Sequence, residues 1–273
     1  MSQRLPVDST VSHDFARALI AFGSNQGDSE EFLQSVLKKI EACDQIDSVR
    51  CSPPMYTKAV GGEDQPDFLN AVISVSTRFS ADQLHQRLVE IENESGRLRR
   101  TRWGARTVDL DLLLFDQQVI NSSDLTLPHP RMSFRRFVLE PALAVAEEMI
   151  HPLSGLSIKQ LVQHLDQAEQ DFQIVLPPST KDQEHARQSW SETLHSGLHD
   201  VQPDQVFTIF ESGKSVSQRS KARFLVFDLD QFDPCISDSI VRLAAPTLNL
   251  TKCSTAERRR EINAAIQAAR PMA

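Results

Sequence analysis

The chain has 273 residues, enough for one large domain or for one domain of ordinary size with an appendage. Its formal net charge of −8 argues against general binding to nucleic acid, whose phosphate backbone selects basic surfaces. No stretch reaches the roughly 20 apolar residues of a membrane span, the start lacks a signal-peptide core, and the four cysteines have no CxxC spacing. We therefore expect a cytoplasmic protein with free thiols that binds neither nucleic acid nor a membrane.

The first part of the chain alternates short apolar strands with amphipathic helices. Residues 1–16 are polar and are predicted to be disordered, and residues 17–176 are predicted to form the first domain. The pattern then predicts, in order, a strand, a helix, two strands, a helix and a strand, with the strands near 18–22, 46–56, 68–77 and 107–115. This order is typical of an α+β fold with a ferredoxin-like antiparallel sheet and helices on its face.

Asn70 interrupts the apolar strand predicted at 68–77. An amide offers both a donor and an acceptor, which suits the edge of a heterocycle. The alternative is an asparagine that satisfies neighbouring backbone groups.

The most informative stretch is GRLRRTRWGARTVDLDLLLFD, residues 96–116, in which cations run directly into an apolar strand. Side chains two residues apart on a strand share a face, so Asp109 and Asp111 are expected to project together, roughly 6 to 7 Å apart. Two buried like charges need compensation from metal ions or from cations nearby. Guanidinium groups bind phosphate oxygens in a bidentate way, so the combination indicates a site for magnesium and a polyphosphate. The alternatives are a solvated basic face and an unrelated pair of aspartates.

A later segment bounded by prolines, LTLPHPRMSFRRFVLEPALAVA, adds further candidates before the next predicted helix. It contains His129, Arg131, Arg135, Arg136 and Phe137. With arginines close by, His129 could bind phosphate or assist a leaving group. The alternative is that His129, as a lone histidine in a loop, has no functional role or only caps a helix.

Four strings occur in order between about residues 18 and 176: AFGSNQGD, VGGEDQPDFLNAV, GRLRRTRWGARTVDLDLLLFD and LTLPHPRMSFRRFVLEPAL. They resemble the 6-hydroxymethyl-7,8-dihydropterin pyrophosphokinase (2-amino-4-hydroxy-6-hydroxymethyldihydropteridine diphosphokinase) family of folate biosynthesis. The resemblance implies transfer of the terminal diphosphate of ATP to the hydroxymethyl group of the dihydropterin, with release of AMP. It also implies two Mg²⁺ ions, with ATP and the dihydropterin as the small-molecule partners.

The same resemblance assigns roles to individual residues. The expected metal ligands are Asp109 and Asp111. The expected contacts of the pterin are Thr57, Phe68, Asn70 and Phe137. The expected contacts of ATP are Arg97, Arg106, His129 and Arg135. The expected residues of the mobile catalytic loop are Arg97, Arg99, Arg102, Trp103 and Arg106.

In the resemblance Trp103 closes the catalytic loop over the site, and Gly61 and Gly62 belong to a second loop that moves. The sequence departs from the family pattern at two places. Met55 stands where many members have tyrosine, and Asp124 stands where some have a basic residue. These departures affect individual contacts in the site and leave the implied chemistry intact.

The C-terminal part is predicted to be a polar linker, 177–205, followed by a small α/β unit of unknown role, 206–273. Strands are expected near 206–210, 223–229 and 245–250, and a helix is expected over 255–269, with a capping box from Ser254 to Glu257. The unit buries few apolar residues, so we expect it to dock on the first domain or on a protein partner. Asp228 and Asp230 repeat the D-x-D pattern, but no arginine cluster accompanies them in the sequence, which favours strand-end carboxylates over a metal site.

Two other functions fit parts of this pattern. One is a non-catalytic regulatory protein that binds nucleotide or pterin, with the C-terminal unit as its effector. The other is an ordinary kinase that transfers the γ-phosphoryl group and releases ADP.

Overall fold

The computed structural model describes residues 15–60, 65–95, 107–176, 183–184, 187–190, 207–209, 222–228, 230 and 246–271. Several predicted functional residues fall outside these ranges, namely Gly61, Gly62, Arg97, Arg99, Arg102, Trp103 and Arg106. The predicted disordered start and most of the predicted linker also fall outside them.

The first sheet is antiparallel, with the strand order β2-β4-β1-β5, and β3 pairs with β4 beyond the end of β2. The strands are β1 (Ala16–Ser24), β2 (Ile46–Cys51), β3 (Met55–Thr57), β4 (Phe68–Thr77) and β5 (Asp109–Phe115). Helix α1 (Ser29–Glu41) follows β1, and helix α2 (Ala81–Glu94) follows β4. This confirms the predicted ferredoxin-like sheet. The single strand predicted at 46–56 is two strands, because Pro53 and Pro54 have no N–H to donate to a ladder.

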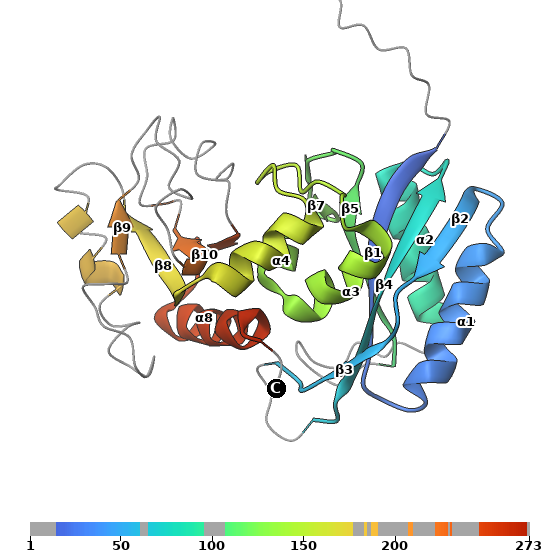
Figure 1. The fold of residues 1–273 in the computed structure, drawn as a ribbon, viewed down its shortest axis with the longest axis horizontal. Helices are drawn as coiled ribbons and strands as arrows, with labels where there is room; N and C mark the ends of the chain where they lie inside the picture. The colour runs from blue at the N-terminus through green and yellow to red at the C-terminus, as the bar shows by residue number, and fades with distance from the viewer. Residues whose placement is uncertain are drawn as a thin grey trace, which may run out of the picture.

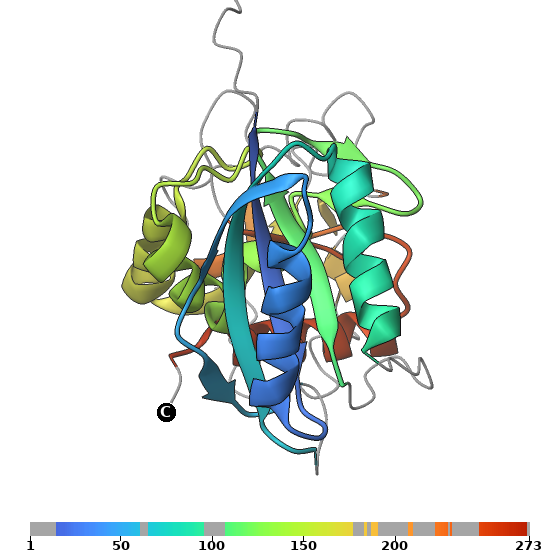
Figure 2. The ribbon, with the colours of Figure 1, turned by 90° about the vertical axis from the view of Figure 1, so that its right-hand side faces the viewer.

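The alternation of side chains along the strands gives the sheet two apolar faces. Ile20, Phe22 and Ile73 belong to a core under α1 and α2, which cover one face (Figure 2). Leu19, Val72 and the β5 residues that share their face belong to a second core, on the opposite side. The functional residues of β5 and β4 lie on this second side.

A further segment follows β5, and its helices cover the second face of the sheet. Its elements are β6 (Ile120–Asn121), β7 (Thr126–Leu127), the short 3₁₀ helix η1 (Met132–Phe134), α3 (Arg136–Ala146) and α4 (Ile158–Gln167). Helix α3 packs against β4, and a capping box between Ser157 and Gln160 begins α4. The predicted helix after the prolines is therefore present as α3.

The second sheet is parallel, with the order β11-β10-β8-β9 (Figure 1). Its strands are β8 (Gln170–Leu176), β9 (Phe207–Ile209), β10 (Ala222–Phe227) and β11 (Thr247–Asn249), and α8 (Thr255–Ala269) follows them. The Ser254 to Glu257 capping box is present at the start of α8. Strand β8 pairs in this sheet, so the second sheet begins upstream of residue 176, where the sequence analysis set the end of the first domain.

The two sheets share one apolar core, which contains side chains from β1, β4 and β5 together with others from β8, β10 and α8. The ring centroid of Phe224 on β10 lies 5.2 Å from that of Phe134 in η1 and 5.9 Å from that of Phe172 on β8. The buried Arg136 of α3 donates through Nε to the carbonyl oxygen of Ala269 at 2.8 Å. The C-terminal unit is thus docked on the rest of the chain, which is the intramolecular alternative of the prediction.

Asp228 at the end of β10 is buried and forms an ion pair with Arg258 of α8. The guanidinium of Arg258 also lies 4.3 Å from the ring centroid of Trp190. The sequence shows no arginine cluster beside Asp228. The fold brings one arginine to it, Arg258, which lies 30 positions later in the sequence. This pairing agrees with a structural carboxylate at the end of a strand.

In the part of the chain that the structure describes, no helix combines the length and the apolar character needed to cross a membrane.

Candidate active site

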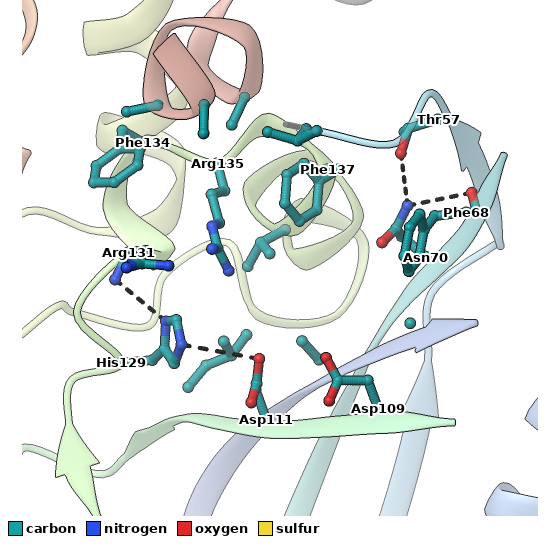
Figure 3. Close-up of a pocket in the computed structure, with 18 of the residues that line it drawn as sticks. Thr57, Phe68, Asn70, Asp109, Asp111, His129, Arg131, Phe134, Arg135 and Phe137 are labelled. Carbon is teal, nitrogen blue, oxygen red and sulfur yellow. Dashed lines mark hydrogen bonds and ion pairs between the residues drawn. The ribbon is translucent and has the colours of Figure 1, made fainter. Parts of the chain in front are cut away.

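A cavity of about 320 Å³ lies between the second face of the first sheet and the helices α3 and α8. Figure 3 shows β5 with its two aspartates on one side and a turn of α8 on the other. Residues of β1, β3, β4, β5, η1, α3, β11 and α8, with residues of the loops beside them, line this cavity, which we call the pocket. The candidate site therefore depends on the tertiary fold as a whole.

Asp109 and Asp111 project from β5 into the pocket (Figure 3). Gly23 and Ala21 of β1 pair with Asp109 and Asp111. Gly23 has no side chain and Ala21 has only a methyl group, so neither fills the pocket beside the carboxylates. A Cβ atom at Gly23 would lie 3.8 Å from Oδ1 of Asn70 and 4.0 Å from Cβ of Asp109, so a larger side chain there would enter the pocket. Small residues on the central strand thus make room between the carboxylates and β4.

Glu92 holds the strand that carries these carboxylates. It is buried near the end of α2, and its Oε1 accepts a hydrogen bond of 2.7 Å from the backbone N of Leu110. Leu110 lies between the two aspartates in sequence, so this bond fixes the backbone of β5 where the aspartates project. Glu92 is not among the residues predicted from the sequence, although a glutamate beside the apolar face of a helix is a visible signal.

His129 lies beside Asp111, with 3.9 Å between its Nε2 and Oδ2 of the aspartate. Its Nδ1 accepts a hydrogen bond of 3.3 Å from the backbone N of Arg131, so in the neutral ring the hydrogen is on Nε2 and faces the aspartate. Burial, followed by repulsion from Arg135 and Arg131, lowers the pKa of His129 to about 3. His129 is therefore neutral at physiological pH and can act as a hydrogen-bond donor.

Two arginines bring positive charge into the pocket. Arg135 precedes the first turn of α3, and burial and the neighbouring Arg131 lower its pKa to about 10, so it stays protonated at neutral pH. Its guanidinium carbon lies 5.5 Å from the ring centroid of Phe137. Arg131 forms an ion pair of 2.9 Å with Glu261 of α8. Arg136, next to Arg135 in sequence, points away and anchors α8.

The other end of the pocket is built from β3, β4 and α3. Thr57, Phe68, Asn70 and Phe137 all line it. The Asn70 side chain donates through Nδ2 to Oγ1 of Thr57 at 2.9 Å and to the carbonyl oxygen of Phe68 at 3.3 Å (Figure 3). These bonds fix the orientation of the amide, so Asn70 satisfies neighbouring groups and also lines the pocket.

The donor set at the carboxylate edge fits magnesium that is shared with a phosphate. Mg²⁺ usually keeps one or two protein carboxylates and completes its shell with water and substrate phosphates. Asp109 and Asp111 supply two such oxygen donors, and their neighbour His129 is a neutral donor of hydrogen bonds. Among the described residues there is no group of three or more histidine, cysteine, aspartate or glutamate side chains placed to hold a metal by themselves. A site completed by phosphate oxygens is consistent with that arrangement.

The structure brings together all the predicted site residues that it describes, namely Thr57, Phe68, Asn70, Asp109, Asp111, His129, Arg135 and Phe137. The two departures from the family pattern lie outside this group. Met55 pairs with Asn70 across β3 and β4, and Asp124 is exposed in the turn between β6 and β7.

Helix α8 supplies pocket residues that the sequence analysis did not anticipate. Its contribution is Glu261, Ala264, Ala265 and Ala268. Residues with this spacing share one face of a helix. The spacing signals an amphipathic helix but not its position, so no local signal could have placed these residues in the site.

The sequence of the chain is similar to that of proteins of one family. A family model described as 7,8-dihydro-6-hydroxymethylpterin-pyrophosphokinase (HPPK) matches residues 19–147. The 2-amino-4-hydroxy-6-hydroxymethyldihydropteridine pyrophosphokinase of Haemophilus influenzae is 39% identical over 150 residues, which cover 54% of this chain and 94% of that protein. The protein of the same name from Bacillus subtilis is 39% identical over 132 residues, which cover 48% of this chain and 79% of that protein.

A solved structure of Plasmodium falciparum HPPK-DHPS aligns with 93% of this chain and 80% of its own chain, at 9% identity and a TM-score of 0.42. The sequence matches define the class of the protein: it is a pyrophosphokinase, an enzyme of the transferase class. The chain belongs to the 7,8-dihydro-6-hydroxymethylpterin-pyrophosphokinase family of folate biosynthesis.

Proposed function

We propose that the chain catalyses magnesium-dependent transfer of diphosphate from ATP to the hydroxymethyl group of 6-hydroxymethyl-7,8-dihydropterin and releases AMP. The observation that carries this proposal is the composition of one pocket. At one end are two carboxylates with an arginine and a neutral histidine, and at the other are two aromatic rings with an oriented amide. The first group suits a metal-bound polyphosphate, and the second suits a flat heterocycle.

In the proposed reaction the hydroxymethyl oxygen forms a bond to the β-phosphorus of ATP. The bond from that phosphorus to the oxygen bridging to the α-phosphorus breaks, the hydroxyl proton is released, and AMP leaves with the bridging oxygen. Asp109 and Asp111 would hold two Mg²⁺ ions, which when bound neutralise phosphate charge and polarise the transferring group. Most of the catalysis in such a transfer comes from positioning and from charge stabilisation.

The remaining described residues have roles that follow from their charge and place. Arg135 stays protonated and binds phosphate oxygens, and His129 donates from Nε2 to a phosphate oxygen instead of delivering a proton. Phe68 and Phe137 hold the two faces of the pterin, and Asn70 with Thr57 contacts its edge. The roles of Trp103 and of the cations in residues 97–106 stay predictions from the resemblance, and a cytoplasmic location stays a prediction from the sequence.

The experiment that tests this function identifies the nucleotide product. The purified chain is incubated with Mg²⁺, ATP and 6-hydroxymethyl-7,8-dihydropterin, and the nucleotides are separated by ion-exchange chromatography. We expect AMP and pterin diphosphate in equal amounts, and no AMP when the pterin is left out. Formation of ADP would show a γ-phosphoryl kinase, and the absence of any turnover with retained binding would show a non-catalytic binder.

A further inference from the structure

Helix α8 of the C-terminal unit forms one wall of the pocket (Figure 3). Three alanines of α8 and Leu248 of β11 face the pocket, and Glu261 adds a carboxylate to the same wall. The spacing of Glu261, Ala264 and Ala268 places them on one stripe of the helix. The C-terminal unit therefore reaches the proposed substrates directly.

Contacts outside the pocket fix this wall at both ends of the helix. Near its N-terminus, Arg258 pairs with the buried Asp228. At its C-terminus, the carbonyl oxygen of Ala269 accepts from Arg136, which also pairs with Asp166 at 2.7 Å. The position of Glu261 in the pocket is thus set by the docking of the whole helix.

Glu261 is a buried carboxylate, and its partner in the pocket is Arg131, at 2.9 Å. A buried carboxylate is costly unless a cation compensates it, so loss of Arg131 from this pair would leave an uncompensated charge in the docked helix. Arg131 and Arg135 repel each other, and the negative charge of Glu261 offsets that repulsion. The negative charge of Glu261 therefore compensates part of the positive charge of the two arginines as long as no anionic ligand is present.

A polyphosphate that enters the pocket brings negative charge that competes with Glu261 for the arginines. Its oxygens attract guanidinium groups and repel a nearby carboxylate that is shielded from water. If Arg131 turns to the phosphates, Glu261 is left buried without this partner; if Arg131 stays, Glu261 keeps one arginine away from the ligand. In both cases Glu261 weakens the binding of the anion.

We propose that Glu261 is a positioning residue that competes with the nucleotide's polyphosphate for Arg131, so that nucleotide binding and the docking of α8 oppose each other. The inference rests on the proposed function in one respect, namely that the pocket takes a nucleotide polyphosphate. It extends that function by making the C-terminal unit a determinant of nucleotide affinity.

The test measures binding of an ATP analogue whose α–β bridging oxygen is replaced by a methylene group, because this analogue cannot transfer its diphosphate. Titration calorimetry with Mg²⁺ present compares the wild type with Glu261→Gln, which keeps the size of the side chain and removes its charge. We expect Glu261→Gln to bind the analogue at least about threefold more tightly. The matched control is Glu147→Gln, an exposed glutamate paired with Lys159 outside the pocket, which should bind as the wild type does.

The role of Arg131 is tested by repeating Glu261→Gln in an Arg131→Gln background. If Glu261 acts through Arg131, the gain in affinity should disappear there; an equal gain in both backgrounds would overturn the competition. In turnover assays the KM for ATP should fall in Glu261→Gln while the KM for the pterin stays the same, a split that a general loss of structure would not produce.

A further measurement needs no substitution. Saturation of the wild type with the analogue should speed hydrogen exchange of the amides of residues 261–269, because the polyphosphate either draws Arg131 away from Glu261 or repels the Glu261 carboxylate, and both loosen the helix. Unchanged or slower exchange would overturn the proposal. Equal affinities of the wild type and Glu261→Gln would overturn this inference alone. Failure of every protein to bind the analogue would overturn the proposed function and the inference together.

Discussion

Asp111 is the residue at which the proposed chemistry can be tested with little risk to the fold. Its side chain is 43% exposed and its neighbour His129 is neutral, so its main stabilising interaction is the attraction to Arg135, which water partly screens. Asp111→Ala should lower turnover by at least about 100-fold, since a bound metal ion supplies several kcal/mol of charge stabilisation. The AMP assay measures the loss of turnover, and a thermal unfolding curve measures the change in stability. The control is Asp44→Ala, which removes an exposed carboxylate from the turn after α1.

Retained turnover in Asp111→Ala would contradict the metal assignment, whereas a large fall in the unfolding temperature would show that Asp111 is structural.

His151 makes stability depend on pH. It is buried, its Nδ1 accepts from the backbone N of Ser154 at 3.2 Å, and burial lowers its pKa from 6.5 to about 4. The folded state therefore binds the proton more weakly than the unfolded state, and the stabilisation is complete above about pH 6.5 and lost as the pH falls towards 4. The loss amounts to about 3 kcal/mol for this shift.

His151→Asn keeps an acceptor near Nδ1 but cannot take up the proton. Between pH 7.5 and pH 4.5 the free energy of unfolding of the wild type should fall by about 2 kcal/mol more than that of the variant. Urea unfolding at the two pH values measures this difference. If the free energy of unfolding falls by the same amount in the wild type and in the variant, His151 does not contribute to acid sensitivity.

At the scale of elements, the bond from Glu92 to Leu110 connects α2 with β5 beside the site. Glu92→Ala leaves the backbone N–H of Leu110 without this acceptor, and the free energy of unfolding should fall by about 1 to 3 kcal/mol. Glu92→Gln, whose amide oxygen can still accept, should lose less. Urea unfolding measures both, and Glu90→Ala, which removes an exposed partner of Arg87 on the same helix, should change stability by less than about 1 kcal/mol.

At the scale of the whole molecule, the two sheets depend on one shared core. Removal of residues 170–273 would expose apolar side chains of α3, α4 and η1 that β8, β10 and α8 now cover. Each large side chain exposed costs about 1.5 to 3 kcal/mol, and a domain has only about 5 to 15 kcal/mol of stability in total. The shortened chain should therefore aggregate or unfold at temperatures at which the full chain is folded.

Solubility after expression and thermal unfolding test this prediction, with a chain that ends at Arg270 as the control. A shortened chain with unchanged stability and turnover would show that the C-terminal unit is an independent appendage.

The sequence by itself determined the local features of this protein. The period-2 pattern of β5 placed Asp109 and Asp111 on one face, and apolar periodicity with a capping box predicted α8 with the bounds it has. The order of strands and helices predicted the ferredoxin-like sheet. These features follow from interactions between residues that are close in sequence, and the four motifs were enough to indicate the family.

Only the tertiary structure decided which distant elements meet at the pocket. Arg135 and Arg136 are neighbours in sequence, yet one lines the pocket and the other holds α8, because the start of α3 turns them to different sides. The pair of Arg131 with Glu261 joins residues 130 positions apart, for which the sequence carries no local signal. That pair exists because the second sheet buries its apolar surface against the first, and this brings α8 to the open side of the pocket that Asp109 and Asp111 face.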